Sequence, residues 1–188
     1  MATTTETAEP KSVRWSQQEY YRMAEIGLFD DKRVELIEGE IVEMSPMLSP
    51  HATAIILVGE ALHDAFDRTY LIRAQLPLDL SQYSLPEPDV AVILGKVRDY
   101  SAAHPTSALL VVEISKSPLA FERGLKSRLY ASAGIADYWI LDLEHKVLEV
   151  QRNPVDGVYS SRQTLSKEQS VSPLAAPQTA IVVADLLP

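Results

Sequence analysis

The feature that most constrains the fold of this chain is a nearly continuous apolar run at residues 109–114. Such a run is typical of a central β-strand that is covered on both faces. A helical pattern follows from about Pro118 to Ala133 and is closed by Gly134, and a further apolar strand follows at residues 138–142. A strand, a helix and a strand in this order predict an α/β fold class.

Capping residues, turn residues and spacing predict the remaining elements. Ser16 is a helix N-cap with Glu19 at the capping-box position, and that helix should end near Ile26. The other expected elements are a hairpin at residues 34–37 and 40–44, a helix from residue 49 or 50 to about 68, short strands at 70–74, 76–80, 89–94 and 147–150, and a turn-rich segment after residue 153 with one strand at 180–183. Residues 1–12 are expected to be a flexible tail, and residues 13–188 a single domain.

Charge and composition limit the classes of function. The formal net charge is −9, from 17 basic and 26 acidic residues, which counts against a nucleic-acid enzyme because Lys and Arg supply most of the affinity for phosphate. Residues 116–128 are a local exception, with four basic side chains against Glu122 alone. The absence of cysteine excludes disulfides, zinc–thiolate sites and cysteine nucleophiles. With no membrane-length apolar stretch and no signal-peptide pattern, we expect a cytoplasmic protein without a membrane partner.

Two carboxylates occupy positions that favour a metal site. Glu113 interrupts the most apolar strand, where an unpaired carboxylate costs several kcal/mol or has a strongly raised pKa. Asp89 opens another apolar strand directly after Pro88. If the two strands are neighbours, both acids converge on one Mg²⁺, which favours one or two carboxylates with water and a substrate phosphate. The alternatives are that Glu113 pairs with a core Arg or Tyr and that Asp89 caps a turn.

Lys126 is the third residue of interest. On a helical wheel for residues 118–133, Lys126 falls within the apolar arc, whereas Ser127 and Arg128 point away from it. A lysine on the core-facing stripe needs an acidic partner, and Glu113 and Glu122 are the two candidates. The alternative is a lysine at the edge of the stripe whose amine reaches solvent.

Several segments in this order together resemble the Uma-type restriction endonucleases of the PD-(D/E)XK superfamily. The resemblance covers roughly residues 15–150 and rests on RVELIEGEIV at 33–42, SPH at 49–51, PDV at 88–90, VEIS at 112–115, ERGLK at 122–126 with Tyr130, and GIADYWILD at 134–142.

This resemblance implies a restriction-endonuclease-like core, a mixed β-sheet flanked by helices, that binds Mg²⁺ or Mn²⁺ and hydrolyses phosphodiester bonds of DNA. Asp89 and Glu113 match the two metal-binding acids of the motif. The superfamily usually places its lysine two residues after the second acid, where this chain has Ser115. Similarity to this family implies that the catalytic lysine comes from the following helix instead, as Lys126.

The resemblance also suggests further site residues and partners. Glu35 matches an acid in the first hairpin and is a candidate metal or water ligand, although a half-exposed strand glutamate is the alternative. Arg123, Ser115 and His51 are candidate substrate-binding residues, and a structural role is the alternative for His51. DNA is the expected partner, and a homodimer is the expected assembly, with the apolar C-terminal segment as a candidate interface.

Two other functions remain open from the sequence. A catalytically inactive nuclease-fold protein, acting as a dimeric interaction or regulatory module, fits the net charge of −9 and the displaced lysine. A nuclease that hydrolyses RNA instead of DNA is the second.

Overall fold

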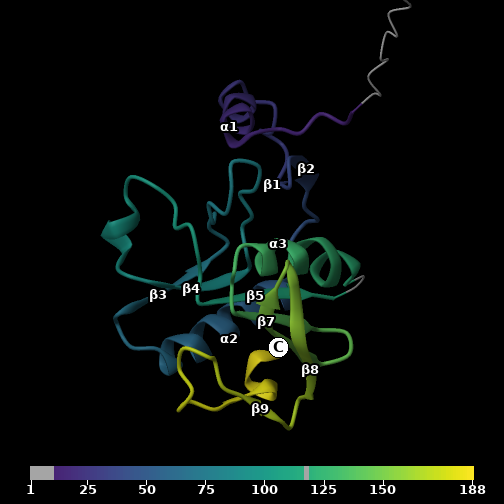
Figure 1. The fold of residues 1–188 in the computed structure, drawn as a ribbon. Helices are drawn as coiled ribbons and strands as arrows, with labels where there is room; N and C mark the ends of the chain where they lie inside the picture. Colours follow the sequence, from purple (N-terminus) through teal and green to yellow (C-terminus); the bar gives the residue numbers. More distant parts are fainter. Residues whose placement is uncertain (1–10, 117–118) are drawn as a thin grey trace, which may run out of the picture.

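The computed structural model describes residues 11–116 and 119–188, and a six-stranded sheet forms its centre (Figure 1). Its strands, in spatial order, are β3 (Tyr70–Ala74), β4 (Val90–Leu94), β5 (Leu110–Ser115), β6 (Asp137–Asp142), β7 (Val147–Val155) and β8 (Val158–Ser166). β5 and β6 are parallel and all other neighbours are antiparallel. The predicted α/β fold with a mixed sheet is therefore confirmed.

Alternation along β4 and β5 sends side chains to two separate cores. Val90, Val92 and Val112 pack on one face of the sheet with helix α2 (Ser49–Ala65) and with the C-terminal elements β9 (Ser170–Val171), β10 (Ile181–Val182) and η3 (Val183–Leu186). Ala91 and Val111 pack on the other face with α3 (Ser127–Ser132). Figure 1 shows α2 and α3 on opposite sides of the sheet. Glu113 is two residues from Val111, so it faces the α3 side.

The N-terminal elements form as the capping and turn residues predict. Ser16 caps α1 (Gln17–Glu25), with both hydrogen bonds of the capping box in place. Strands β1 (Val34–Ile37) and β2 (Glu40–Glu43) form an antiparallel hairpin. Its turn residues Glu38 and Gly39 have φ of 50° and 85°, the left-handed pair that a two-residue hairpin requires.

Two expectations about strands are wrong. Residues 76–80 form no strand, because Pro77 has no N–H to donate and the hydrogen bonds there go to separate partners, Pro86 and Pro105. Residues 153–188 are more regular than expected, because β7 continues to Val155 and turns at Asp156 into the long strand β8. Only Tyr159 and Leu165 of β8 are buried, so this edge strand carries little apolar alternation.

Some expectations fall outside the described residues. Residues 1–10 of the expected tail and Pro118, the expected start of the second helix, are among them. Between β4 and β5 the chain makes one short helical turn, η1 (Val97–Tyr100). Of the helices in the described ranges, none combines the length and the apolarity that a bilayer crossing demands.

Candidate active site

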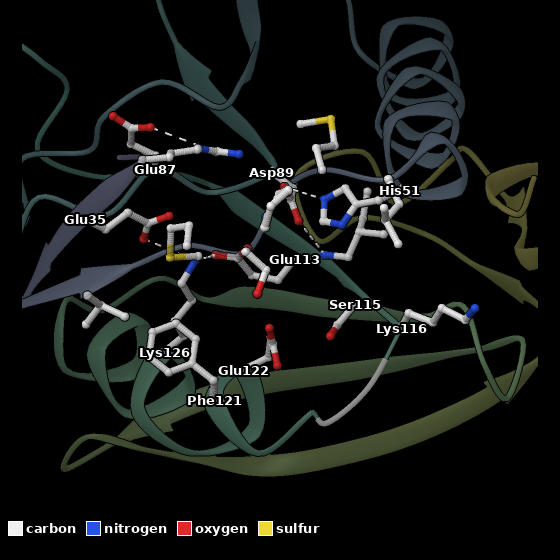
Figure 2. Close-up of a pocket in the computed structure, with 18 of the residues that line it drawn as sticks. Glu35, His51, Glu87, Asp89, Glu113, Ser115, Lys116, Phe121, Glu122 and Lys126 are labelled. Atoms are coloured by element: carbon white, nitrogen blue, oxygen red, sulfur yellow. Dashed lines mark hydrogen bonds and ion pairs between the residues drawn. The ribbon is translucent and has the colours of Figure 1, made fainter. Parts of the chain in front are cut away.

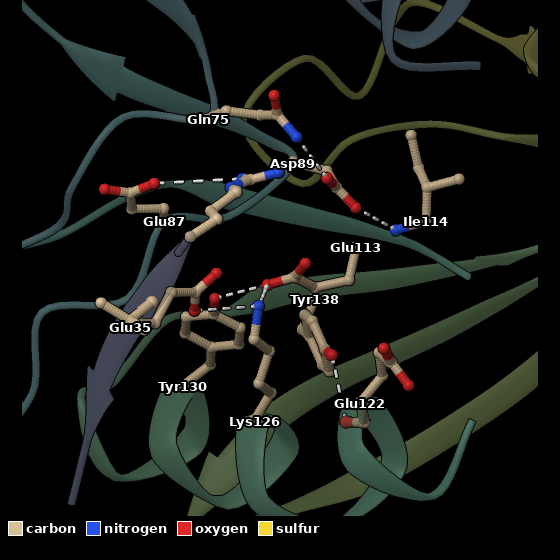
Figure 3. Close-up of polar contacts among 12 residues, drawn as sticks. Glu35, Gln75, Glu87, Asp89, Glu113, Ile114, Glu122, Lys126, Tyr130 and Tyr138 are labelled. Atoms are coloured by element: carbon tan, nitrogen blue, oxygen red, sulfur yellow. Dashed lines mark hydrogen bonds and ion pairs between the residues drawn. The ribbon is translucent and has the colours of Figure 1, made fainter. Parts of the chain in front are cut away.

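The antiparallel pairing of β4 with β5 brings Asp89 and Glu113 to the same end of the sheet. Val90 pairs with Val112, so Asp89, the residue before β4, lies beside Glu113 and Ile114 of β5. The Ile114 N–H donates to Asp89 Oδ2 at 2.8 Å, which joins the two strand ends directly. Glu113 lies in β5, whereas Asp89 directly precedes β4, which begins one residue later than predicted. Both acids are buried and lie close together, as the sequence predicted (Figure 3).

Asp89 is held by donors on both carboxylate oxygens. His51 Nε2 lies 2.8 Å from Oδ1, and the Gln75 side-chain amide donates to the same oxygen at 3.2 Å. Burial opposes ionisation of Asp89, but the contact with His51 and the Ile114 N–H outweigh it and hold the pKa of Asp89 below its usual value. Asp89 is therefore an oriented carboxylate and not a turn cap.

Glu113 lies within a buried ionic cluster on the α3 side of the sheet. Lys126 Nζ donates to Glu113 Oε1 at 2.9 Å, and the Tyr130 hydroxyl donates to the same oxygen at 2.6 Å. Lys126 Nζ also lies 3.3 Å from Glu35 Oε2. Glu35, Glu113 and Lys126 are only 1%, 3% and 2% exposed, so the alternatives of a half-exposed Glu35 and a solvent-reaching Lys126 are both wrong.

A π-helical turn, η2 (Glu122–Lys126), brings Lys126 to these acids before α3 begins. A π turn contains one more residue than an α turn and is frequent at functional sites. The extra residue shifts the wheel, so Ser127, expected to point outward, is buried and donates to Gln151 at 2.8 Å. Glu122 forms no ion pair with Lys126 in the described residues, and Glu113 and Glu35 are its partners.

The cluster has more negative than positive charge. Burial raises the pKa of Glu113 to about 7, against the effect of Lys126 and with the help of Asp89 and Glu35. Burial alone would lower the pKa of Lys126, but Glu113 and Glu35 outweigh it, so the net pKa is raised and the amine stays protonated. Once Glu113 has lost its proton, one ammonium faces two carboxylates, with Asp89 close by, and a divalent cation would balance this excess of negative charge.

The unsatisfied atoms of the site also fit a cation. Both carboxylate oxygens of Glu35 are buried, and within the described residues neither accepts a hydrogen bond. Oε2 of Glu122 is likewise buried and accepts no hydrogen bond from the described residues. Residues 11–116 and 119–188 contain no group of three or more His, Asp or Glu side chains arranged to hold a metal ion. The carboxylate oxygens of Asp89, Glu113 and Glu35 are the kind of donor that suits Mg²⁺ or Mn²⁺, which need only one or two protein carboxylates besides water or a phosphate.

These acids lie at the base of an open pocket of about 450 Å³ (Figure 2). Ser115 and His51 line this pocket, as expected of substrate-binding candidates. Arg123 does not, because its guanidinium is hydrogen-bonded to Glu149 at 2.9 Å and 3.1 Å and lies 3.7 Å from Asp142. Six of the seven predicted site residues therefore line one pocket. Arg123 lies outside it and is hydrogen-bonded to Glu149 of β7.

The model of the Uma2 family, described as "Putative restriction endonuclease", matches residues 17–184. This chain belongs to the Uma2 family. The resemblance drawn from the sequence motifs is thereby confirmed.

A solved structure shows the same fold at low sequence identity. It is the crystal structure of a "putative nuclease belonging to DUF820" from Anabaena variabilis ATCC 29413, with a TM-score of 0.72 and 15% identity over 91% of this chain and 96% of that one. A search of curated proteins gives no match.

Three residues of this Uma2 site escaped the sequence analysis as site residues. Tyr130 was named as part of the family motif and not as a site residue. Its hydroxyl contacts Glu113, as the alternative of a core tyrosine partner for Glu113 allowed, and its place one turn after Lys126 is the signal for this contact. Gln75 follows β3 with φ of 51°, and nothing in its local sequence marks it. Glu87 lines the pocket and has a pKa that burial raises, and it lies between the two prolines before Asp89.

The raised pKa of Glu113 predicts how stability depends on pH in this Uma2 protein without metal. Folded Glu113 retains its proton up to about pH 7, whereas the unfolded side chain releases it near 4.5. The free energy of unfolding should therefore fall as pH rises through this window, and Glu113→Gln should remove roughly 3 kcal/mol of that fall. Urea unfolding in EDTA between about pH 4.5 and 7 measures this dependence of the free energy of unfolding on pH.

The exposed Glu60→Gln variant is the control and should show the same slope of unfolding free energy against pH as wild type. Equal slopes for wild type and Glu113→Gln would contradict the raised pKa of Glu113.

Proposed function

We propose that this chain is a divalent-metal-dependent endonuclease that hydrolyses phosphodiester bonds of DNA. The observation that carries the proposal is the convergence of Asp89, Glu113, Glu35 and Lys126 at the base of one open pocket. Membership of a family described as restriction endonucleases supports the reaction class and the DNA substrate.

Asp89 and Glu113 would hold Mg²⁺ or Mn²⁺, with Glu35 as a further ligand of the ion or of its water. When bound, such an ion polarises a phosphate oxygen and increases the acidity of a coordinated water. Asp89 is kept ionised and fixed by His51, Gln75 and the Ile114 N–H. Glu113 presents one oxygen to Lys126 and Tyr130, which leaves the second oxygen for the ion.

Lys126 serves as a cation and not as a general base. Its raised pKa keeps the amine protonated, so it would orient the attacking hydroxide by donating a hydrogen bond and would offset the charge that develops on the phosphorus oxygens. Both Glu113 and Glu35 hold the amine in place, so little reorganisation is needed when substrate binds.

DNA and a second copy of the chain remain the proposed partners, and a cytoplasmic location remains an expectation. The C-terminal segment remains a candidate dimer interface, although only part of its apolar surface is free. Ile181, Val183 and Leu186 are at most 5% exposed because they pack on α2 and the sheet. Leu174 and Val182 are 45% and 36% exposed and are the apolar side chains that a second copy would contact.

Thermal denaturation with divalent ions tests the proposal. At about one hundred times its Kd, Mg²⁺ or Mn²⁺ should stabilise the folded chain by about 2.7 kcal/mol and raise its Tm by about 5 to 10 °C. Asp89→Asn should abolish the rise, because the amide offers no anionic ligand, whereas Asp64→Asn on the exposed side of α2 should keep it. A wild-type Tm that neither ion changes would favour the alternative of a catalytically inactive nuclease-fold protein.

A further inference from the structure

The pocket above the acids has an apolar wall that faces solvent. The segment between β2 and α2 supplies Met47 and Leu48 to this wall, with exposed fractions of 40% and 63%. Phe121 and Leu143 line the same pocket. Met47 and Leu48 are adjacent and share the pocket with Phe121 and Leu143, so they form a contiguous apolar surface beside the acids that a ligand would cover.

Positive charge is scarce around this pocket and lies at its two ends. Arg33 lines one end, 3.9 Å from Glu87 and 36% exposed. Lys116 is exposed and lines the other end, and Figure 2 places it on the opposite side of Glu113 from Glu87. Lys126 and Lys32 are held at shorter distances than Arg33, since Lys126 is buried with two acids and Lys32 pairs with Glu43 at 3.1 Å.

An apolar wall between two separated cations suits an unpaired nucleotide better than a continuous duplex. A duplex hides the faces of its bases and presents about twice the phosphate charge per unit length of one strand, so a net charge of −9 opposes its binding more strongly. An unpaired strand presents a free base face and a phosphate together, and the base face stacks on or packs against apolar side chains. A volume of about 450 Å³ lies within the range of pockets that enclose one small ligand.

We propose that the substrate is single-stranded or locally unpaired DNA. One base packs against Met47 and Leu48, and the strand runs between Arg33 and Lys116. Its scissile phosphate lies at Asp89 and Glu113. This inference rests on the proposed nuclease function and adds the substrate form to it.

Oligonucleotide binding tests the substrate form. Fluorescence anisotropy in Ca²⁺ compares one labelled DNA strand with the blunt duplex of the same sequence, and the single strand should bind at least about tenfold more tightly. Met47→Gln and Leu48→Asn keep the length of the respective side chain and add no charge, and each should weaken single-strand binding by about fivefold or more. Ile56→Gln, at a residue that is also exposed (60%) but lies outside the pocket, should bind as wild type does.

Salt dependence tests the two cations separately from the apolar wall. Arg33→Gln and Lys116→Gln should each reduce the slope of log K against log salt by about 0.7, the value for one phosphate contact on a single strand. Met47→Gln should lower affinity without changing that slope. Lys167→Gln, at a solvent-exposed position (58%) between β8 and β9, should change neither quantity.

The outcomes separate this inference from the function on which it rests. Equal or tighter binding of the duplex, or unchanged binding by the Met47 and Leu48 variants, would overturn the unpaired substrate. If the metal-induced rise in Tm and cleavage of duplex DNA persisted, the nuclease function would stand without it. Tighter binding of an RNA strand of the same sequence would overturn the assignment to DNA. Absence of metal-dependent cleavage on every substrate form would remove the nuclease function itself.

Discussion

Replacing Glu113 with Gln should lower metal-dependent cleavage by about 10³-fold or more. A loss of about 4 kcal/mol of transition-state stabilisation produces this factor, and ligation by a metal ion contributes several kcal/mol. The amide keeps the shape of the side chain and an oxygen that can accept from Lys126 and Tyr130, but it is a far weaker ligand for a hard cation. The measurement is single-turnover cleavage of a labelled oligonucleotide over a range of Mg²⁺ and Mn²⁺ concentrations.

The fold should survive this substitution, because the neutral amide resembles the protonated carboxyl that folded Glu113 carries up to about pH 7 in the absence of metal. Circular dichroism and a Tm within a few degrees of metal-free wild type would establish that the loss is chemical. Glu60→Gln on the exposed side of α2 is the matched control and should cleave at the wild-type rate. Cleavage by Glu113→Gln within tenfold of wild type would contradict its assignment as a metal ligand.

Replacing Lys126 with Met should damage both activity and stability. Loss of one preorganised donor at the developing charge costs about 10²- to 10³-fold in kcat. Removing one partner of a buried ion pair also costs about 3 to 5 kcal/mol, because the remaining charges stay buried without compensation. Here the remaining charges are Glu35 and Glu113, both almost fully buried. Denaturant unfolding and single-turnover cleavage measure the two effects.

Metal should rescue the stability of Lys126→Met but not its activity. A divalent ion would replace the missing positive charge near Glu35 and Glu113, so the Tm rise on adding Mg²⁺ should be larger than in wild type. If Lys126→Met does not fold without metal, folding and cleavage are compared with metal present throughout. Lys167→Met, which removes an exposed lysine paired loosely with Glu168 at 3.8 Å, is the control and should change neither property. Cleavage by Lys126→Met at the wild-type rate would show that the amine is structural.

Local chemistry in the sequence was sufficient for much of the fold. Ser16 and Glu19 fixed the start of α1 because a capping box depends only on residues three apart. The unbroken apolar run of β5 marked a doubly covered strand, and it lies in the middle of the sheet. The polar strand β8 was missed because its order comes from pairing with β7 and not from its own side chains, of which most are exposed.

For the site, the residues and their spacing were enough to show which charged side chains needed partners. A glutamate in a buried strand and a lysine on a core-facing helix stripe each cost too much free energy alone, and Glu113 and Lys126 are 2.9 Å apart. The other contacts could be known only from the folded chain, because contacts between distant segments have no local signature. The β1–β2 hairpin places Glu35 beside Lys126. Gln75, at the end of β3, donates to Asp89. Arg123 is hydrogen-bonded to Glu149 of β7 and therefore lies outside the site. Sequence fixes the free-energy cost of burying each charge, and the packing of the strands decides which partner compensates it.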